Sequence, residues 1–123
     1  MRSYSDIDEK RERLTVTFSR TVRLDDIREM VLMSDKAGIL HYQLLVDASH
    51  ASLAELDGDL TEFQALLTEL ARVSRLGRTA VFVGNDTDLR IVQRLSAAAQ
   101  NWCEINAFLD PQSGKDWLGW GDS

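Results

Sequence analysis

Alternation of apolar and polar residues opens the interpretable part of the chain. Residues 14–19 alternate with period two and include β-branched residues, which predicts a strand with one face on a core. From Leu24 the apolar positions recur every three or four residues, which predicts an amphipathic helix ending near Gly38. The polar segment 2–13 is either a frayed start or a short edge strand over 5–9.

Two short apolar runs do not alternate. Leu44–Val46 and Thr79–Val83 are continuous in hydrophobicity, as is typical of strands covered on both faces of a parallel sheet. We expect them to lie side by side and the first to end at Asp47. Helical spacing returns over 60–73 and again over 89–102, so each run is followed by a predicted amphipathic helix.

A last strand over 105–109 and a terminal helix over 114–120 complete the order of elements. Strands that alternate with helices predict a mainly parallel sheet with right-handed connections. The expected fold class is therefore α/β: a single-layer, mostly parallel sheet of four to five strands with packed helices. One domain is expected over 1–123, with 1–13 as a poorly ordered start or an edge strand.

Composition narrows the classes of partner. The 123 residues are 44% hydrophobic, which is enough for one core. Twenty acidic and fourteen basic residues give a net charge of −6, so we expect neither nucleic acid nor a membrane as partner. Cys103 is the single cysteine, and the chain opens without a charged-then-apolar leader, which together favour a cytoplasmic location.

Polar residues follow both inner strands at their carboxyl ends, where open parallel sheets bind ligands. Asp47 and Ser49 follow the first strand, and Asn85 and Asp86 follow the second. These four residues are the predicted ligand-binding set, although the latter two could instead cap the next helix. His50 beside Ser49 suggests a catalytic triad, but neighbours in one loop cannot converge on a reacting atom. No catalytic residue is predicted.

The predicted loop over 48–59 is long and acidic. Its carboxylates surround Gly58 without the spacing of a calcium loop, so we interpret it as a solvated loop before a helix. The histidines and the cysteine are not at zinc-ligand spacing either. Neither a metal nor a cofactor is predicted. The acidic residues are Glu55, Asp57, Asp59 and Glu62, and the soft ligands are His41, His50 and Cys103.

Two tryptophans near the end leave an alternative open. Trp117 and Trp120 share one helical face, which covers either the domain's own core or a partner. Self-association as a homodimer is a separate expectation, motivated by Trp120 and by a predicted edge strand near Phe18.

The order of elements and several local phrases resemble the STAS and SpoIIAA-like superfamily, which includes anti-sigma-factor antagonists and cytoplasmic domains of sulphate transporters. The chain from about Leu14 carries the resemblance, and its ending looks like that of small bacterial SpoIIAA-like proteins. The matching phrases are Leu14–Ser19 with Val22–Ile27, Leu45–Ser49 ending in Asp-x-Ser, Ala80–Gly84, Phe108 with Asp110, and Trp117 with Leu118.

The resemblance implies a non-enzymatic regulatory or binding domain. Antagonists of this superfamily carry an Asp-Ser-Ser-Gly phosphorylation motif at the start of the helix after this strand. That motif falls near 57–59, where the chain has no serine. Ser49 and Thr61 are the hydroxyls left as candidate phosphorylation sites.

Two functions follow as hypotheses. The first is a protein-interaction module that uses the acidic loop 55–62 and the next helix to contact a protein partner. The alternative is a sensor or carrier of a small molecule, such as a nucleotide, lipid or metabolite, at the carboxyl ends of the strands. Lipid-binding CRAL-TRIO-like proteins share the architecture, but 123 residues leave little room for a lipid-sized cavity.

Overall fold

The computed structural model describes residues 3–71 and 76–120. It contains one five-stranded sheet, four α-helices and one 3₁₀ helix within that part of the chain. The strands are β1 (Ser3–Asp8), β2 (Arg13–Thr21), β3 (Gln43–Ser52), β4 (Thr79–Val83) and β5 (Ile105–Phe108). The helices are α1 (Leu24–Lys36), η1 (Ala54–Gly58), α2 (Leu60–Ala71), α3 (Asp86–Ala99) and α4 (Pro111–Leu118).

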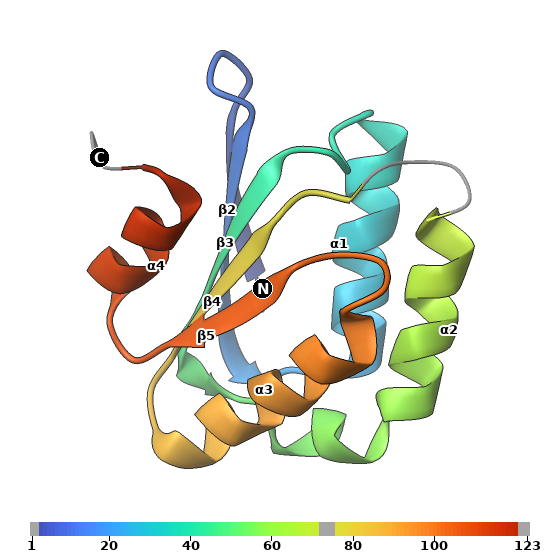
Figure 1. Ribbon diagram of the computed structural model, residues 1–123, viewed down its shortest axis with the longest axis vertical. Coiled ribbons are helices and arrows are strands. Elements are labelled where there is room, and N and C mark those ends of the chain that lie inside the picture. Colours follow the sequence, from blue (N-terminus) through green and yellow to red (C-terminus); the bar gives the residue numbers. More distant parts are fainter. Residues whose placement is uncertain (1–2, 72–75, 121–123) are drawn as a thin grey trace.

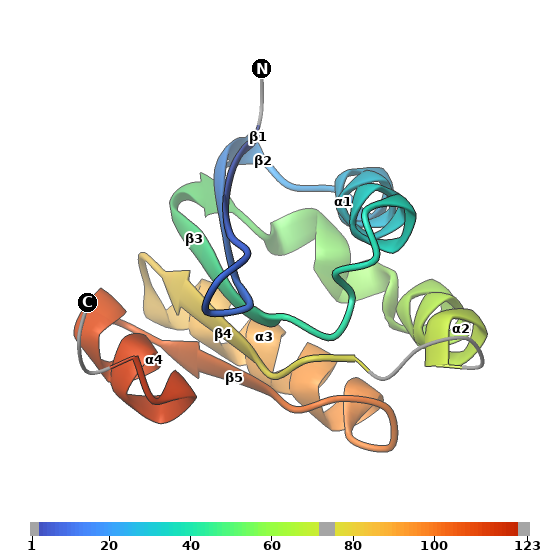
Figure 2. The same cartoon turned by 90° about the horizontal axis from the view of Figure 1, so that it is seen from above.

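The strands lie in the sheet in the order in which they occur along the chain. β1 pairs antiparallel with β2, and every later pair is parallel. Since each crossover steps to the next strand in the same direction, right-handed connections place their helices on one face. Figures 1 and 2 show α1, α2 and α3 on that face and α4 on the other. This confirms the predicted mostly parallel α/β sheet with packed helices.

The two inner strands lie side by side, as predicted. Val46 and Val81 are register partners facing the three crossover helices, and Leu45 and Ala80 are register partners on the face that carries α4. A strand buried on both faces has no polar positions to alternate with apolar ones. The unbroken apolar run of β3 is therefore explained by the two helical layers.

The predicted end of β3 at Asp47 is wrong. β3 continues to Ser52, and η1 occupies most of the remaining segment that was expected to be a loop over 48–59. The residues of this extension are small or polar, so they show no pattern of apolar positions that would predict a strand. Its hydrogen bonds come from β2, which extends to Thr21, and a register shift in that pairing places a bulge at the extension.

The start of the chain follows the edge-strand alternative. β1 pairs with β2 over its whole described length, and the turn between them contains Glu12 in the left-handed region at φ 55°. The predicted helix over 60–73 ends at Ala71 in the described part of the chain, and Val73 lies outside the described residues.

α3 begins at one of its two predicted caps and ends at Ala99, before the predicted end at Trp102. Asn85 is the N-cap, and its side-chain oxygen accepts a hydrogen bond of 2.8 Å from the Asp88 backbone amide. The predicted capping role of Asn85 is confirmed. Asp88 is buried, and its carboxylate accepts a 3.4 Å hydrogen bond from the Leu53 amide, joining α3 to the segment before η1.

The predicted terminal helix 114–120 starts too late. α4 begins at Pro111, because the Asp110 carboxylate accepts hydrogen bonds of 2.8 Å from the amide and from the hydroxyl of Ser113. These bonds, the backbone one foremost, lower the pKa of Asp110. Gly119, at φ 82°, ends the helix.

Trp120 lies in the domain's own core. It is 3% exposed and packs with Leu45, Ala80 and Leu118 beneath α4. Its indole nitrogen donates a 2.7 Å hydrogen bond to the Gln43 side chain. Trp120 therefore covers the domain's own core and not a partner.

The residues that motivated the expected homodimer do not form a surface. Trp120 is buried, and Phe18 is buried on β2, which β1 covers at the edge of the sheet. Self-association stays a prediction without support from these two side chains. Across residues 3–71 and 76–120, no helix combines the length and apolar character that crossing a bilayer requires.

Candidate functional site

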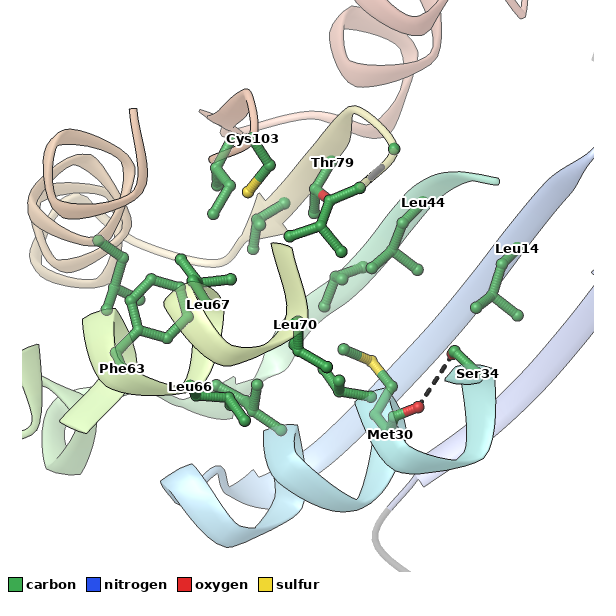
Figure 3. A pocket seen from close by; sticks show the side chains of 18 of the residues that line it. Leu14, Met30, Ser34, Leu44, Phe63, Leu66, Leu67, Leu70, Thr79 and Cys103 are labelled. Atoms are coloured by element: carbon green, nitrogen blue, oxygen red, sulfur yellow. Dashed lines mark hydrogen bonds between the residues drawn. The ribbon is translucent and has the colours of Figure 1, made fainter. Parts of the chain in front are cut away.

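An apolar cavity of about 150 Å³ lies between the sheet and the helices α1 and α2. Figure 3 shows side chains from both layers pointing into it. An engineered cavity of about this size, lined by leucine, isoleucine and phenylalanine, stays dry and binds benzene. Its wall includes Leu14, Leu44, Leu66, Leu67 and Leu70.

The cavity follows from a weak apolar face on α1. The side chains of Ile27, Met30 and Val31 are only half-buried, and the next position on this face is a serine. The Ser34 hydroxyl donates a 2.9 Å hydrogen bond to the Met30 carbonyl (Figure 3). A small, internally bonded side chain stands where a larger apolar one would fill the space, so α1 covers the sheet without filling the layer.

The half-buried residues of the cavity wall lie along α1 and near the amino ends of the strands. Near the carboxyl ends its wall is made of buried side chains such as Phe18, Leu53 and Leu56. Near the amino ends the wall also includes half-buried residues. The half-buried set that we call the amino-end opening is Leu40, Tyr42, Leu76, Gly77, Thr79 and Cys103.

Backbone contacts make this opening rigid at one side. The Gly77 amide donates a 3.0 Å hydrogen bond to the Leu40 carbonyl, and the Leu44 amide donates one of 2.9 Å to the Arg78 carbonyl. A methyl group added to Gly77 would lie 1.9 Å from the Tyr42 carbonyl oxygen. Only glycine lets the two strand entries approach this closely.

Few polar groups reach the cavity, and those that do are uncharged. Burial raises the pKa of the Cys103 thiol to about 11, so the thiol is protonated. Thr79 contributes a hydroxyl. It is the register partner of Leu44 on β3 and of Ile105 on β5. Tyr42 adds a phenol at the amino-end opening. Among the described residues, the lining contains neither a lysine nor an arginine nor a carboxylate.

The residues predicted from the strand ends lie elsewhere. The Ser49 hydroxyl donates a 2.6 Å hydrogen bond to the Asp47 carboxylate, which also accepts a 3.1 Å bond from the Ser49 amide. A Cβ atom on Gly84 would lie 2.4 Å from the Ser49 carbonyl oxygen. The bulge in β3 thus brings Asp47 and Ser49 together beside the end of β4.

Asn85 and Asp86 lie at the start of α3. The Asn85 side chain is used as the α3 cap, and Asp86 is exposed in the first turn. Thr61 is exposed in the first turn of α2, whereas a phosphate on Ser49 would stand beside the Asp47 carboxylate. Ligand binding at these four residues, and phosphorylation at Ser49 or Thr61, stay predictions.

The acidic segment before α2 is partly neutralised by this chain. Glu55 pairs with Arg23 at 3.3 Å, and Asp57 pairs with Arg94 at 2.7 Å. The described residues contain no group of three side chains placed to hold a metal ion. A protein contact at the acidic segment would have to compete with these ion pairs.

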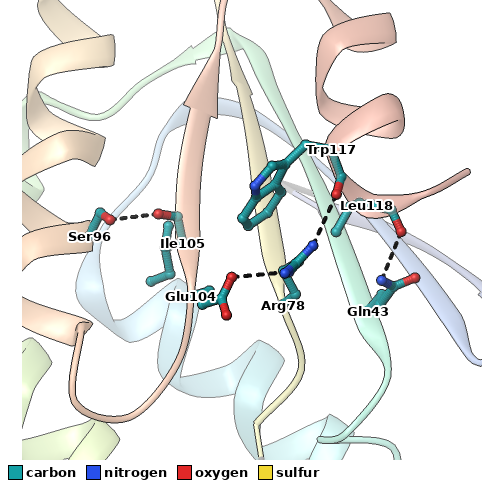
Figure 4. A network of polar contacts seen from close by, with 7 residues as sticks. All are labelled: Gln43, Arg78, Ser96, Glu104, Ile105, Trp117 and Leu118. Atoms are coloured by element: carbon teal, nitrogen blue, oxygen red, sulfur yellow. Dashed lines mark hydrogen bonds and ion pairs between the residues drawn. The ribbon is translucent and has the colours of Figure 1, made fainter.

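A polar network fixes α4 over the amino ends of three strands (Figure 4). Arg78 pairs with Glu104 at 3.1 Å, donates a 3.1 Å hydrogen bond to the Trp117 carbonyl, and stacks 4.8 Å from its ring. The Gln43 side chain donates a 2.9 Å hydrogen bond to the Leu118 carbonyl. The Arg78 guanidinium is therefore held on the sheet face opposite the cavity.

Comparison with solved structures identifies the fold. The chain superposes on an uncharacterized protein of the DUF3478 family from Shewanella loihica PV-4, which is described as having a SpoIIAA-like fold. The TM-score is 0.56 at 20% sequence identity, over 94% of this chain and 93% of that one. The fold is SpoIIAA-like. The sequence matches neither a protein-family model nor a curated protein.

The SpoIIAA-like fold confirms the resemblance seen in the sequence, and at this identity it concerns architecture alone. The hydrophobic pattern did not predict the cavity, although one signal was present. Ser34 stands on the apolar face of α1 together with Ile27, Met30 and Val31. A serine at a core-facing helix position marks a place where the core is incompletely filled.

Proposed function

We propose that this SpoIIAA-like domain binds a small apolar molecule in the cavity between the sheet and helices α1 and α2. The cavity itself carries the proposal: it measures about 150 Å³, is bounded mainly by apolar side chains, and has half-buried residues near the amino ends of the strands. This is the small-molecule function expected as an alternative from the sequence, placed at a different site.

The size of the cavity limits the ligand. A void of this volume suits a molecule near the size of benzene and falls below the roughly 300 Å³ at which drug-sized ligand pockets begin. A lipid would require α1 to move away from the sheet. The first ligand to test is therefore a single aromatic ring without a polar group.

Toluene is a suitable probe, with unfolding followed by circular dichroism and binding followed by amide NMR shifts. At about ten times its dissociation constant, a ligand of the native state adds about 1.4 kcal/mol to the free energy of unfolding. Saturable stabilisation and localised shifts support the proposal. A flat titration up to the solubility of toluene overturns it.

A matched pair of variants locates the site. Thr79→Ile places a larger apolar side chain in the cavity wall, and Thr15→Ile makes the same change on the opposite sheet face, where Thr15 is the register partner of Leu45. The proposal requires weaker toluene binding in Thr79→Ile alone. Equal affinity in both variants would move the site out of the cavity.

The protein-interaction hypothesis stays a second proposal. It is supported by the exposed carboxylates before α2 and opposed by their ion pairs with Arg23 and Arg94. Co-purification of one partner from a native lysate, lost in a Glu55→Gln and Asp57→Asn double variant, would support it. Recovery of this chain alone, or a partner retained by the double variant, would count against the acidic segment.

A further inference from the structure

We infer that the amino-end opening selects ligands by charge. This inference rests on the proposed function. The cavity would bind an apolar molecule whose polar end is neutral or positively charged, and it would bind the corresponding carboxylate more weakly. The polar end would lie at the opening, and the apolar part would lie in the cavity.

The first observation is the uneven distribution of polar groups in the wall. Tyr42, Thr79 and Cys103 all belong to the amino-end opening, and the carboxyl-end wall is apolar. The Cys103 thiol is protonated. The hydroxyls of Tyr42 and Thr79 remain as neutral groups able to donate to or accept from a ligand. A bound amphiphile therefore has one favourable orientation.

The second observation is the carboxylate held beside the opening. Glu12 lies in the turn between β1 and β2, and its carboxylate is 3.2 Å from the His41 ring nitrogen. Its carbonyl accepts a 3.1 Å hydrogen bond from the Gln43 amide. The turn is therefore held against His41 and Gln43, the residues on either side of Tyr42 in the sequence.

The charges that act on the Tyr42 phenol are also negative. Burial raises the pKa of Tyr42, and the negative charges of three carboxylates in or next to the turn raise it further. In decreasing order of effect these belong to Glu9, Glu12 and Asp8. An anionic group at the opening would experience the same repulsion as the phenolate.

The described arginines of the β1–β2 hairpin and of the β4 entry are directed elsewhere. Arg13 stacks 4.8 Å from the ring of Trp120, and Arg78 stacks on Trp117, both on the opposite sheet face. Arg11 pairs with Asp8 at 3.8 Å, and Lys10 is exposed in the turn. The turn contains equal numbers of acidic and basic residues, yet the carboxylates in or next to it are the charges that raise the pKa of Tyr42.

Benzyl alcohol, benzylamine and benzoate test the inference, because they share one ring and differ in the charge of the polar end. Amide NMR titrations at neutral pH give the dissociation constants, with toluene as reference. The carboxylates of the turn would repel benzoate across a few ångströms of solvent, which screens the interaction. We therefore expect benzoate to bind about five-fold more weakly than benzyl alcohol. Benzylamine should bind at least as tightly as the alcohol.

A charge-neutral variant separates repulsion from the general cost of burying a carboxylate. In a Glu9→Gln and Glu12→Gln double variant, the difference between benzoate and benzyl alcohol should fall to about two-fold. Glu62→Gln is the control, because Glu62 lies at the start of α2, far from the opening along the strands. This variant should leave the difference between benzoate and benzyl alcohol unchanged.

The outcomes separate the two proposals. If neither toluene nor any benzyl compound binds, the proposed function fails. If toluene binds but benzoate binds as tightly as the alcohol, the charge inference fails and the cavity function survives. If benzoate is weak to the same degree in the double variant, the turn carboxylates are not the cause and the inference is overturned.

Discussion

Replacing Trp120 by alanine should detach α4 from the sheet at a large cost in stability. A tryptophan side chain buries about 150 to 250 Å², and Trp120 is 3% exposed. At about 25 cal/mol per Å² this burial corresponds to about 4 to 6 kcal/mol. Part of this area stays buried in the unfolded chain, so the expected loss in the free energy of unfolding is about 3 to 5 kcal/mol. This is the usual range for the substitution.

The measurement is urea-induced unfolding followed by far-ultraviolet circular dichroism. Trp120→Phe keeps most of the buried area but removes the indole donor to Gln43, so it should cost about 1 to 3 kcal/mol and stays measurable if the alanine variant does not fold. Leu109→Ala, at a 50% exposed position, is the control and should change stability by less than about 0.5 kcal/mol. A loss below about 1 kcal/mol in Trp120→Ala would refute the burial of α4 against the sheet.

Three further expectations concern single positions. Gly77→Ala should cost about 1 to 3 kcal/mol of stability because its methyl group would meet a backbone oxygen, whereas Gly58→Ala, with nothing within 4 Å, should be nearly neutral; equal effects in urea titrations would contradict the close approach. The pKa of Asp110 is lowered in the folded state, so its stabilising effect is present above the unfolded value of about 3.9 and is lost as the pH falls through the folded pKa. Unfolding titrations from neutral to acidic pH should show a loss in the wild type that Asp110→Asn lacks, and parallel curves would exclude it. With a pKa of about 11, the Cys103 thiol should react slowly with an aromatic disulfide reagent at about pH 8 until urea unfolds the chain; rapid reaction of the native protein would contradict the raised pKa.

Much of the fold could be predicted because burial on two faces leaves a direct trace in the pattern. Leu44–Val46 and Thr79–Val83 are apolar at every position except the first threonine, and the structure places them at the centre of the sheet. The helix spacing after each strand then determines the crossovers, and right-handed connections place all three on one face.

The missed boundaries have local causes. β3 runs past Asp47 because β2 supplies hydrogen bonds to a polar extension, and no pattern of apolar residues reports a partner strand. α4 starts at Pro111 because the Asp110 cap determines its first turn, although the apolar face begins later. Capping chemistry and strand pairing therefore decided the ends that hydrophobic periodicity left undetermined.

The candidate site was harder to predict than the fold. Carboxyl-end positions such as Asp47 and Ser49 are visible in a sequence because polar residues follow an apolar strand. A cavity is a shortage of side-chain volume between layers, and it involves residues from α1, α2 and the sheet that are far apart in the chain. Ser34 was the visible trace, and its effect depends on which side chains face it across the layer.

The binding of a neutral apolar ring between the sheet and α1 is tested most directly by intermolecular nuclear Overhauser effects in a complex with toluene. The structure predicts contacts from the ring protons to methyl groups of Leu14, Leu44 and Leu70, which line the cavity from β2, β3 and α2. Contacts confined to exposed side chains such as Leu32 or Met33, or none at saturation, would contradict the account.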